Sequence, residues 1–93
     1  MEEKIFAKHP DPAKQGVNIS KAKYDAVKTE ILAALQNGKE LTLKELFAAV
    51  GEKLKGKFDG SISWYTTVVK LDLEARKTII RVPKSKPQQM RLK

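Results

Sequence analysis

The spacing of apolar residues predicts three α-helices in this chain, followed by two short β-strands. The first helix is expected between Ser20 and Gly38, where apolar side chains recur every three or four residues. The hydroxyl of Ser20 can cap the first turn, and Gly38 supplies a stop. The apolar residues of this helix are Tyr24, Val27, Ile31, Ala34 and Leu35.

A second helix is expected between Thr42 and Gly56. Thr42 and Glu45 have the capping-box pattern, in which each side chain accepts a hydrogen bond from the other residue's backbone amide. Leu41, isolated between polar residues before this helix, is consistent with a very short strand. The apolar stripe of the helix consists of Leu43, Leu46, Phe47, Val50 and Leu54.

The third helix, Ser61 to Lys77, is predicted to have two apolar stripes. One consists of Trp64, Val68, Leu71 and Ala75, and the other of Ile62, Tyr65, Val69 and Leu73. The polar arc between them holds Ser63, Thr66, Thr67, Lys70 and Glu74. A helix that is apolar over so much of its surface should be packed from two sides, with one polar strip free. Because Trp64 and Tyr65 lie on the stripes, we expect core positions for both rather than base-stacking roles.

A β-hairpin is expected after the third helix. The β-branched run from Thr78 to Val82 and the alternating run from Gln88 to Leu92 flank a basic turn that begins and ends with proline. Alternation along the first strand predicts that Ile80 and Val82 face inward and Arg81 faces outward. Residues 1–19, with short extended pieces expected at 4–8 and 16–19, are interpreted as an N-terminal arm.

The order of these elements is helix, short strand, helix, helix, hairpin, which is the order of a winged helix-turn-helix domain. We therefore predict a mainly helical α+β fold, a single winged-helix domain over residues 20–93, with the hairpin as the wing. A chain of 93 residues has room for one core only.

The third helix also carries a family resemblance. Its run Trp64-Tyr65-Thr66-Thr67 through Leu71-Asp72-Leu73-Glu74-Ala75-Arg76 resembles the signature of a small, uncharacterised family of bacterial winged-helix proteins. The run Val17-Asn18-Ile19-Ser20 to Tyr24 is similar to that family's lead-in to its first helix. The exit of helix 3 into the wing resembles that of winged-helix regulators, although Lys77-Thr78 stands where those usually have a glycine. The resemblance implies the architecture and no known activity.

The charge is concentrated in the C-terminal third. The chain carries a net charge of +8, of which residues 1–60 contribute +2 and residues 61–93 contribute +6. Such asymmetry indicates a polyanionic partner, and the predicted fold favours double-stranded DNA and a role in transcription. The polar face of helix 3 supplies Ser63, Thr66, Thr67 and Lys70 for the major groove, and the wing supplies Arg81, Lys84, Lys86 and Arg91 for phosphates.

Other functions have little support in the sequence. It contains no cysteine and a single histidine, His9, so we predict no metal site or other cofactor. No nucleophile is paired with a base, and we predict no enzymatic activity. Neither a signal sequence nor a membrane span is evident, so we expect a cytoplasmic protein, associated with the nucleoid if it binds DNA. The alternative is a protein-interaction or dimerisation module, with the N-terminal arm pairing two copies.

Overall fold

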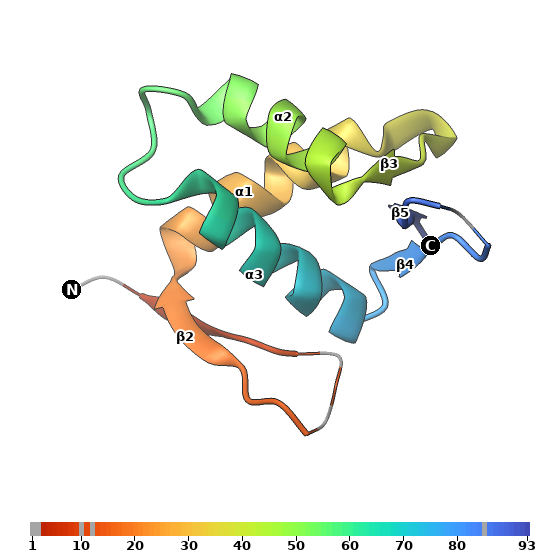
Figure 1. Ribbon diagram of the computed structural model, residues 1–93. Coiled ribbons are helices and arrows are strands. Elements are labelled where there is room, and N and C mark those ends of the chain that lie inside the picture. The colour runs from red at the N-terminus through yellow and green to blue at the C-terminus, as the bar shows by residue number, and fades with distance from the viewer. Residues whose placement is uncertain (1–2, 10, 12, 85) are drawn as a thin grey trace.

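The helices and strands of this domain are known from a computed structural model, which describes residues 3–9, 11, 13–84 and 86–93 (Figure 1). In these residues the helices are α1 (Lys21–Ala34), α2 (Leu43–Leu54) and α3 (Ile62–Ala75), with a 3-10 turn at Gln36–Gly38. The strands are β1 (Lys4–Ala7), β2 (Val17–Ser20), β3 (Leu41–Thr42), β4 (Ile79–Arg81) and β5 (Gln89–Leu92). They form one α+β domain with a three-stranded antiparallel sheet and an N-terminal hairpin.

Each helix begins at the residue that the sequence predicts. The Ser20 hydroxyl accepts a hydrogen bond from the Lys23 amide at 3.3 Å, and the Ser61 hydroxyl accepts one from the Trp64 amide at 3.2 Å. Thr42 and Glu45 form the predicted capping box, with distances of 3.1 and 2.9 Å. These bonds satisfy amides that have no partner within the first turn of a helix.

Helix α3 ends at Ala75, two residues earlier than predicted. Lys77 has a φ of 62°, in the left-handed region where glycine is usual. The Lys77 amide donates to the Glu74 carbonyl at 3.0 Å, and the Thr78 amide donates to the Leu73 carbonyl at 2.9 Å. This pair of bonds is the Schellman arrangement, so the turn out of α3 is a standard one in which lysine takes the place of glycine.

The sheet has the strand order β3-β5-β4, which places the last strand in the middle. The predicted hairpin is confirmed, but the predicted inward facing of Ile80 is wrong, because Ile79 takes the buried position. Ile79 is buried and Ile80 is only half-buried. Arg81 is exposed, as predicted, although it lies opposite the buried Met90 in the sheet. The Schellman turn starts the strand at Ile79, and a shift of one residue reverses which side chains face inward.

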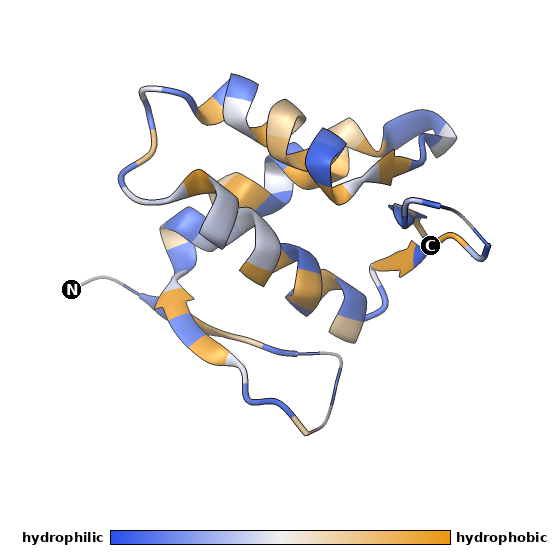
Figure 2. Ribbon diagram, viewed as in Figure 1, coloured by the Kyte–Doolittle hydropathy of each residue, from blue (hydrophilic) through white to orange (hydrophobic). Residues whose placement is uncertain are grey.

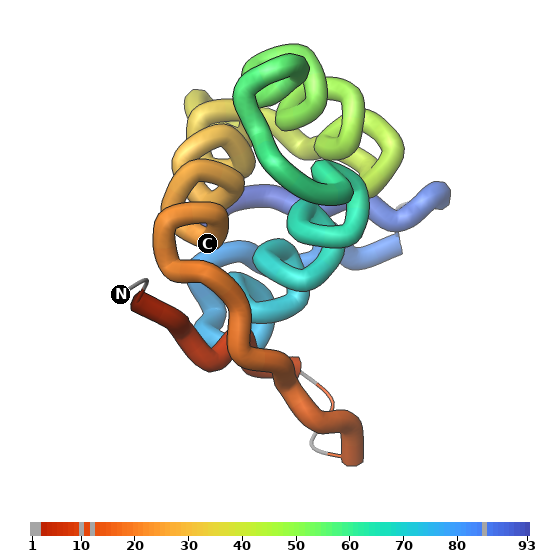
Figure 3. The backbone as a smooth tube through the Cα atoms, turned by 90° about the vertical axis from the view of Figure 1, so that its left-hand side faces the viewer, coloured from red at the N-terminus to blue at the C-terminus, as the bar shows by residue number. Residues whose placement is uncertain are grey.

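Residues at the start of the chain form a second hairpin, in which β1 pairs antiparallel with β2. The predicted extended pieces are therefore confirmed. The strands approach so closely at Gly16 that a β-carbon there would lie 2.0 Å from the Ala7 carbonyl oxygen. Ala7 and Ile19 are both buried in the core of the domain. The segment interpreted as an arm thus packs against α1 and α3 (Figure 3).

The core lies where the apolar faces of the three helices meet (Figure 2). Helix α3 is packed from two sides, as its two apolar stripes predict. One stripe faces α1 and α2 through the buried Val69 and Leu73. Val68 and Leu71, on the other stripe, line a small space together with Ala7 and other residues of the N-terminal hairpin. The buried hydrophobic residues are Ala7, Ile19, Tyr24, Val27, Ile31, Leu35, Leu46, Val50, Leu54, Val69, Leu73, Ile79 and Met90.

Candidate nucleic-acid interface

The polar arc of α3 is only partly accessible. Ser63 is exposed, and Thr67 is half-buried with its hydroxyl donating to the Ser63 carbonyl at 3.0 Å. Thr66 is fully buried, and its hydroxyl donates to the Ile62 carbonyl at 2.7 Å. The expectation that Thr66 lies on an accessible face is therefore wrong. Thr66 shares the inward side of the helix with Val69, three residues on, and its hydroxyl is satisfied within the helix.

Lys70 and Arg81 are both paired with Glu74. The Lys70 ammonium lies 3.3 Å from the Glu74 carboxylate, and the two side chains are only 10% and 6% exposed. The Arg81 Nε donates to the same carboxylate at 3.1 Å, across the junction between α3 and β4. Two of the cations predicted to bind nucleic acid, one in the groove and one on phosphate, are therefore paired within the protein. Lys70 is buried rather than presented on a free polar strip, because its long aliphatic stem packs while its ammonium reaches the carboxylate.

The wing provides the accessible positive charge near α3. Lys84 and Lys86 are exposed, and within the described part of the chain no carboxylate pairs with either. Lys84 has a φ of 64°, which belongs to the turn between β4 and β5. Arg91 is half-buried on β5, and its guanidinium donates to the Leu92 carbonyl at 3.2 Å. Lys84 and Lys86 are thus the predicted contacts that remain free to bind an anion.

Trp64 is 47% exposed, which contradicts the expected core position. Tyr65, the next residue, is half-buried instead and contacts both Trp64 and Phe58 edge to face. Successive residues on a helix differ by about 100° in direction, so when Tyr65 faces inward Trp64 must face outward. The apolar stripe that contains Trp64 is covered by the N-terminal hairpin near Val68 and Leu71, and Trp64 itself remains largely open to solvent.

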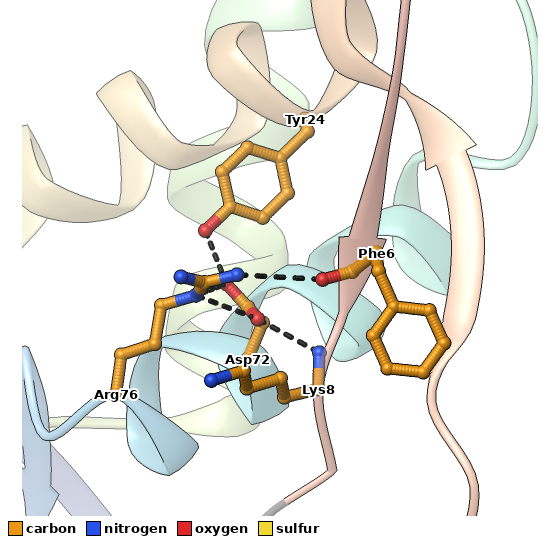
Figure 4. A network of polar contacts seen from close by, with 5 residues as sticks. All are labelled: Phe6, Lys8, Tyr24, Asp72 and Arg76. Carbon is orange, nitrogen blue, oxygen red and sulfur yellow. Dashed lines mark hydrogen bonds and ion pairs between the residues drawn. The ribbon is translucent and has the colours of Figure 1, made fainter.

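Asp72 forms a buried polar network that the sequence analysis did not identify (Figure 4). This fully buried carboxylate accepts hydrogen bonds from the Tyr24 hydroxyl, from the Lys8 backbone amide at 2.8 Å and from the Arg76 Nε at 2.9 Å. Arg76 also reaches the Phe6 carbonyl at 3.4 Å. The network therefore joins α1, α3 and β1. The sequence signal for it was an acidic residue, Asp72, directly between the apolar Leu71 and Leu73.

The Asp72 network changes the protonation properties of its partners. Burial of the Tyr24 phenol and its hydrogen bond to Asp72 raise the pKa of Tyr24 well above its ordinary value of 10.0. The hydrogen bond to Asp72 likewise raises the pKa of Arg76. Both shifts favour a neutral Tyr24 beside a charged Arg76. The Tyr24 hydroxyl and the Arg76 guanidinium therefore keep the protons that they donate to Asp72 at physiological pH.

The two hairpins extend toward the same side of the molecule, which is the side on which α3 lies (Figure 3). Strand β4 of the wing lies next to the C-terminal end of α3 (Figure 1). Lys8 and Lys14, both exposed, belong to the N-terminal hairpin on the other flank. We call the exposed part of α3, represented by Ser63, Trp64 and Thr67, the α3 face.

Other kinds of site have little support among the described residues. They contain no group of three or more histidine, cysteine, aspartate or glutamate side chains suited to hold a metal ion. None of their helices has both the length and the apolar character needed to cross a bilayer. The His9 Nδ1 accepts a hydrogen bond from the Asp11 amide at 3.0 Å, an interaction that is local to the hairpin.

Comparison with known proteins assigns the chain to one family. A model described as "Family of unknown function (DUF6958)" matches residues 4–90, and the chain belongs to that family. The match includes the N-terminal hairpin, all three helices and the chain as far as the first half of β5, so the N-terminal hairpin is part of what defines the family. Neither the curated proteins nor the solved structures contain a match to the chain.

Proposed function

We propose that this member of DUF6958 is a winged-helix domain that binds nucleic acid, with duplex DNA as the main ligand. The proposal takes α2 and α3 as the helix-turn-helix pair and β4 and β5 as the wing. The order of elements and the pairing of β3 with β5 support this interpretation. A regulatory or nucleoid-associated role in the cytoplasm would follow from such binding.

The observation that carries the proposal is the pair of exposed, unpaired lysines on the wing. Lys70 and Arg81 are paired with Glu74, and Arg91 donates a hydrogen bond to the Leu92 carbonyl. Lys84 and Lys86, by contrast, are exposed in the turn of the wing. Lysines in such a position neutralise backbone phosphates regardless of the base sequence. The net charge of +8 adds a long-range attraction that speeds encounter with DNA.

The α3 face supplies little for reading base sequence. Ser63 and Thr67 offer hydroxyls, which bind phosphates and several base edges without strong discrimination. The described part of the helix presents no arginine, asparagine or glutamine to solvent between Ile62 and Ala75. We therefore propose a binder with weak sequence preference and strong dependence on salt concentration.

Replacing both wing lysines tests this proposal. Substitution of Lys84→Gln and Lys86→Gln should weaken binding to all duplexes alike and reduce the log–log salt slope by about two, near one unit for each lost phosphate contact. Fluorescence anisotropy of a labelled duplex at several salt concentrations measures both effects. The fold should be retained, because exposed substitutions typically change stability by less than ~0.5 kcal/mol.

A matched control separates local contact from overall charge. Lys53→Gln and Lys55→Gln remove the same charge from exposed positions at the C-terminal end of α2. In Figure 1 this end lies away from the wing. If the two double variants bind duplex equally well, the wing does not contact phosphate and this proposal is wrong.

A protein-interaction module is the second candidate function. Its specific support is the exposure of two large hydrophobic side chains, Phe6 at 51% and Trp64 at 47%. Aromatic residues of this kind are enriched at protein interfaces. Absence of duplex binding at low salt, together with concentration-dependent self-association in sedimentation experiments, would favour this function over DNA binding.

A further inference from the structure

Trp64 is a large aromatic side chain held open to solvent at the first turn of α3. It is the only tryptophan of the chain. Its backbone amide donates to the capping hydroxyl of Ser61 at 3.2 Å, which fixes the start of the helix. A tryptophan that contributes to a core is usually well buried, and this one is nearly half exposed. Packing of the core therefore does not account for a tryptophan at this position.

The indole ring is supported from behind by two other aromatic rings. The Tyr65 ring meets it edge to face, with 4.9 Å between ring centroids and an angle of 83°. The Tyr65 ring in turn meets Phe58 at 5.1 Å and 74°. Phe58 and Tyr65 are half-buried and pack against the core. Trp64 is thus the outermost ring of a three-ring cluster, which limits its motion while leaving much of its surface free.

Positive charge lies beside this aromatic cluster. The Lys23 ammonium is 5.4 Å from the Tyr65 ring centroid and 5.9 Å from that of Phe58. Lys57 is exposed in the loop that leads to α3 and directly precedes Phe58 in the sequence, and Asp59 in the same loop is the acidic residue nearest in sequence. Within the described part of the chain, neither lysine forms an ion pair. The surroundings of Trp64 are therefore both aromatic and basic.

We propose that Trp64 is a stacking platform for an unpaired base, with Lys23 and Lys57 near the adjoining phosphates. Aromatic rings combined with basic residues are the means by which proteins hold single-stranded nucleic acid without sequence preference. A paired base in a duplex exposes only its edges in the grooves. The face of the indole ring therefore finds no base face on which to stack in a duplex. An apolar protein partner would gain nothing from the two unpaired cations.

This inference rests on the proposed nucleic-acid function and adds the form of the ligand. The wing lysines would hold duplex phosphates, whereas Trp64 would hold a base from a single-stranded segment next to the duplex. The ligand is then a junction between paired and unpaired nucleic acid rather than a uniform duplex.

Titration of the unmodified protein with two probes tests the inference. One probe is a blunt duplex, and the other is the same duplex with a single-stranded oligothymidine tail. We expect the tailed probe to bind about 5- to 100-fold more tightly, as base–aromatic stacking predicts. We also expect the tail alone to quench the tryptophan fluorescence, which comes entirely from Trp64. A tail of ribonucleotides distinguishes RNA from DNA as the source of the base.

Two variants provide the control. Trp64→Ala should abolish the preference for the tailed probe over the blunt duplex, whereas Trp64→Phe should keep part of that preference. Labelled probes report on both variants, and circular dichroism verifies their fold. Equal affinity for both probes without quenching would overturn this inference while leaving the duplex proposal intact. Failure of both probes to bind would overturn the two proposals together.

Discussion

Helix α3 holds one hairpin on each flank through a carboxylate, and the two attachments differ in kind. Asp72 accepts hydrogen bonds from the Lys8 amide, the Tyr24 hydroxyl and the Arg76 guanidinium, and thereby attaches the N-terminal hairpin (Figure 4). Glu74, two residues later, pairs with Lys70 on its own helix and with Arg81 of the wing. Both carboxylates are buried, but Asp72 is held by a hydroxyl and a backbone amide as well as a cation, whereas Glu74 is paired with two cations, of which Arg81 is 54% exposed.

This difference indicates separate roles for the two carboxylates. A buried carboxylate with several donors cannot lose its partners without a large cost, because an uncompensated charge would remain in the interior. A carboxylate paired with a largely exposed cation, as Glu74 is with Arg81, contributes less stability through that pair, but it sets how much positive charge the surface presents. Asp72 thus mainly determines whether the N-terminal hairpin stays attached to α3, and Glu74 mainly determines how much positive charge the surface carries next to the wing.

The largest effect is expected from Asp72→Ala. Removing the carboxylate leaves the Tyr24 hydroxyl and the Arg76 guanidinium without their shared partner, and we expect a loss of about 3–5 kcal/mol in the free energy of unfolding. Urea denaturation followed by circular dichroism measures this loss. Asp59→Ala, at an exposed loop position, is the control and should change stability by less than ~0.5 kcal/mol. Similar stability of the two variants would show that the Asp72 network does not hold the hairpin.

A smaller effect, dependent on pH, is expected from Tyr24→Phe. The loss of one hydrogen bond to a charged group should lower stability by about 1.5–3 kcal/mol near neutral pH. Because the pKa of Tyr24 is raised in the folded protein, its contribution is complete below pH 10.0, the ordinary value, and is lost as the pH rises above that. The difference in stability between parent and variant should therefore narrow in alkali. A difference that stays constant from neutral pH to pH 11 would contradict the assignment.

The smallest stability effect is expected from Glu74→Gln, together with a change in binding. The substitution removes the charge partner of Lys70 and Arg81, and we expect it to cost about 1–2 kcal/mol of stability, because the glutamine amide oxygen can still accept a hydrogen bond. Arg81, whose side chain is 54% exposed, would lose its charge partner and should strengthen binding to duplex DNA and increase the salt slope by about one, whereas Lys70 stays buried. Glu52→Gln, at an exposed position on α2, changes the net charge equally and serves as the control. An equal gain in affinity for both variants would mean that Glu74 has no local role in the interface.

The helices were predictable from the sequence because their signals are local. Caps at Ser20, Thr42 and Ser61 depend on residues three or fewer positions away, and each is found where expected. The apolar stripes of α1 and α2 and the hairpin after α3 also follow from short-range periodicity. By contrast, which side chains of β4 face inward depends on where the Schellman turn ends and the strand begins. If the strand began one residue earlier or later than Ile79, the inward and outward positions would be exchanged.

The features of the candidate site depend on contacts that are distant in sequence. The hydrogen bonds to Asp72 come from Lys8 and Tyr24, which lie 64 and 48 residues away. Thr66 and Trp64 were placed by assigning stripes on an isolated helix, whereas the actual faces are set by the positions of α1, α2 and the N-terminal hairpin. The Lys70–Glu74 pair is local, four residues apart on α3, but the burial of its two side chains depends on the elements that pack around them. Local patterns contain no information about such tertiary contacts.

The central position of β5 in the sheet has a consequence for the order of folding. Strands β3 and β4 each pair with β5, so the three-stranded sheet forms only when residues 89–92 join segments about 10 and 50 residues earlier in the chain. The helices depend on contacts that are available sooner. We therefore expect the helical core to assemble before the wing, and β5 to complete both the sheet and the burial of Met90 as a late step.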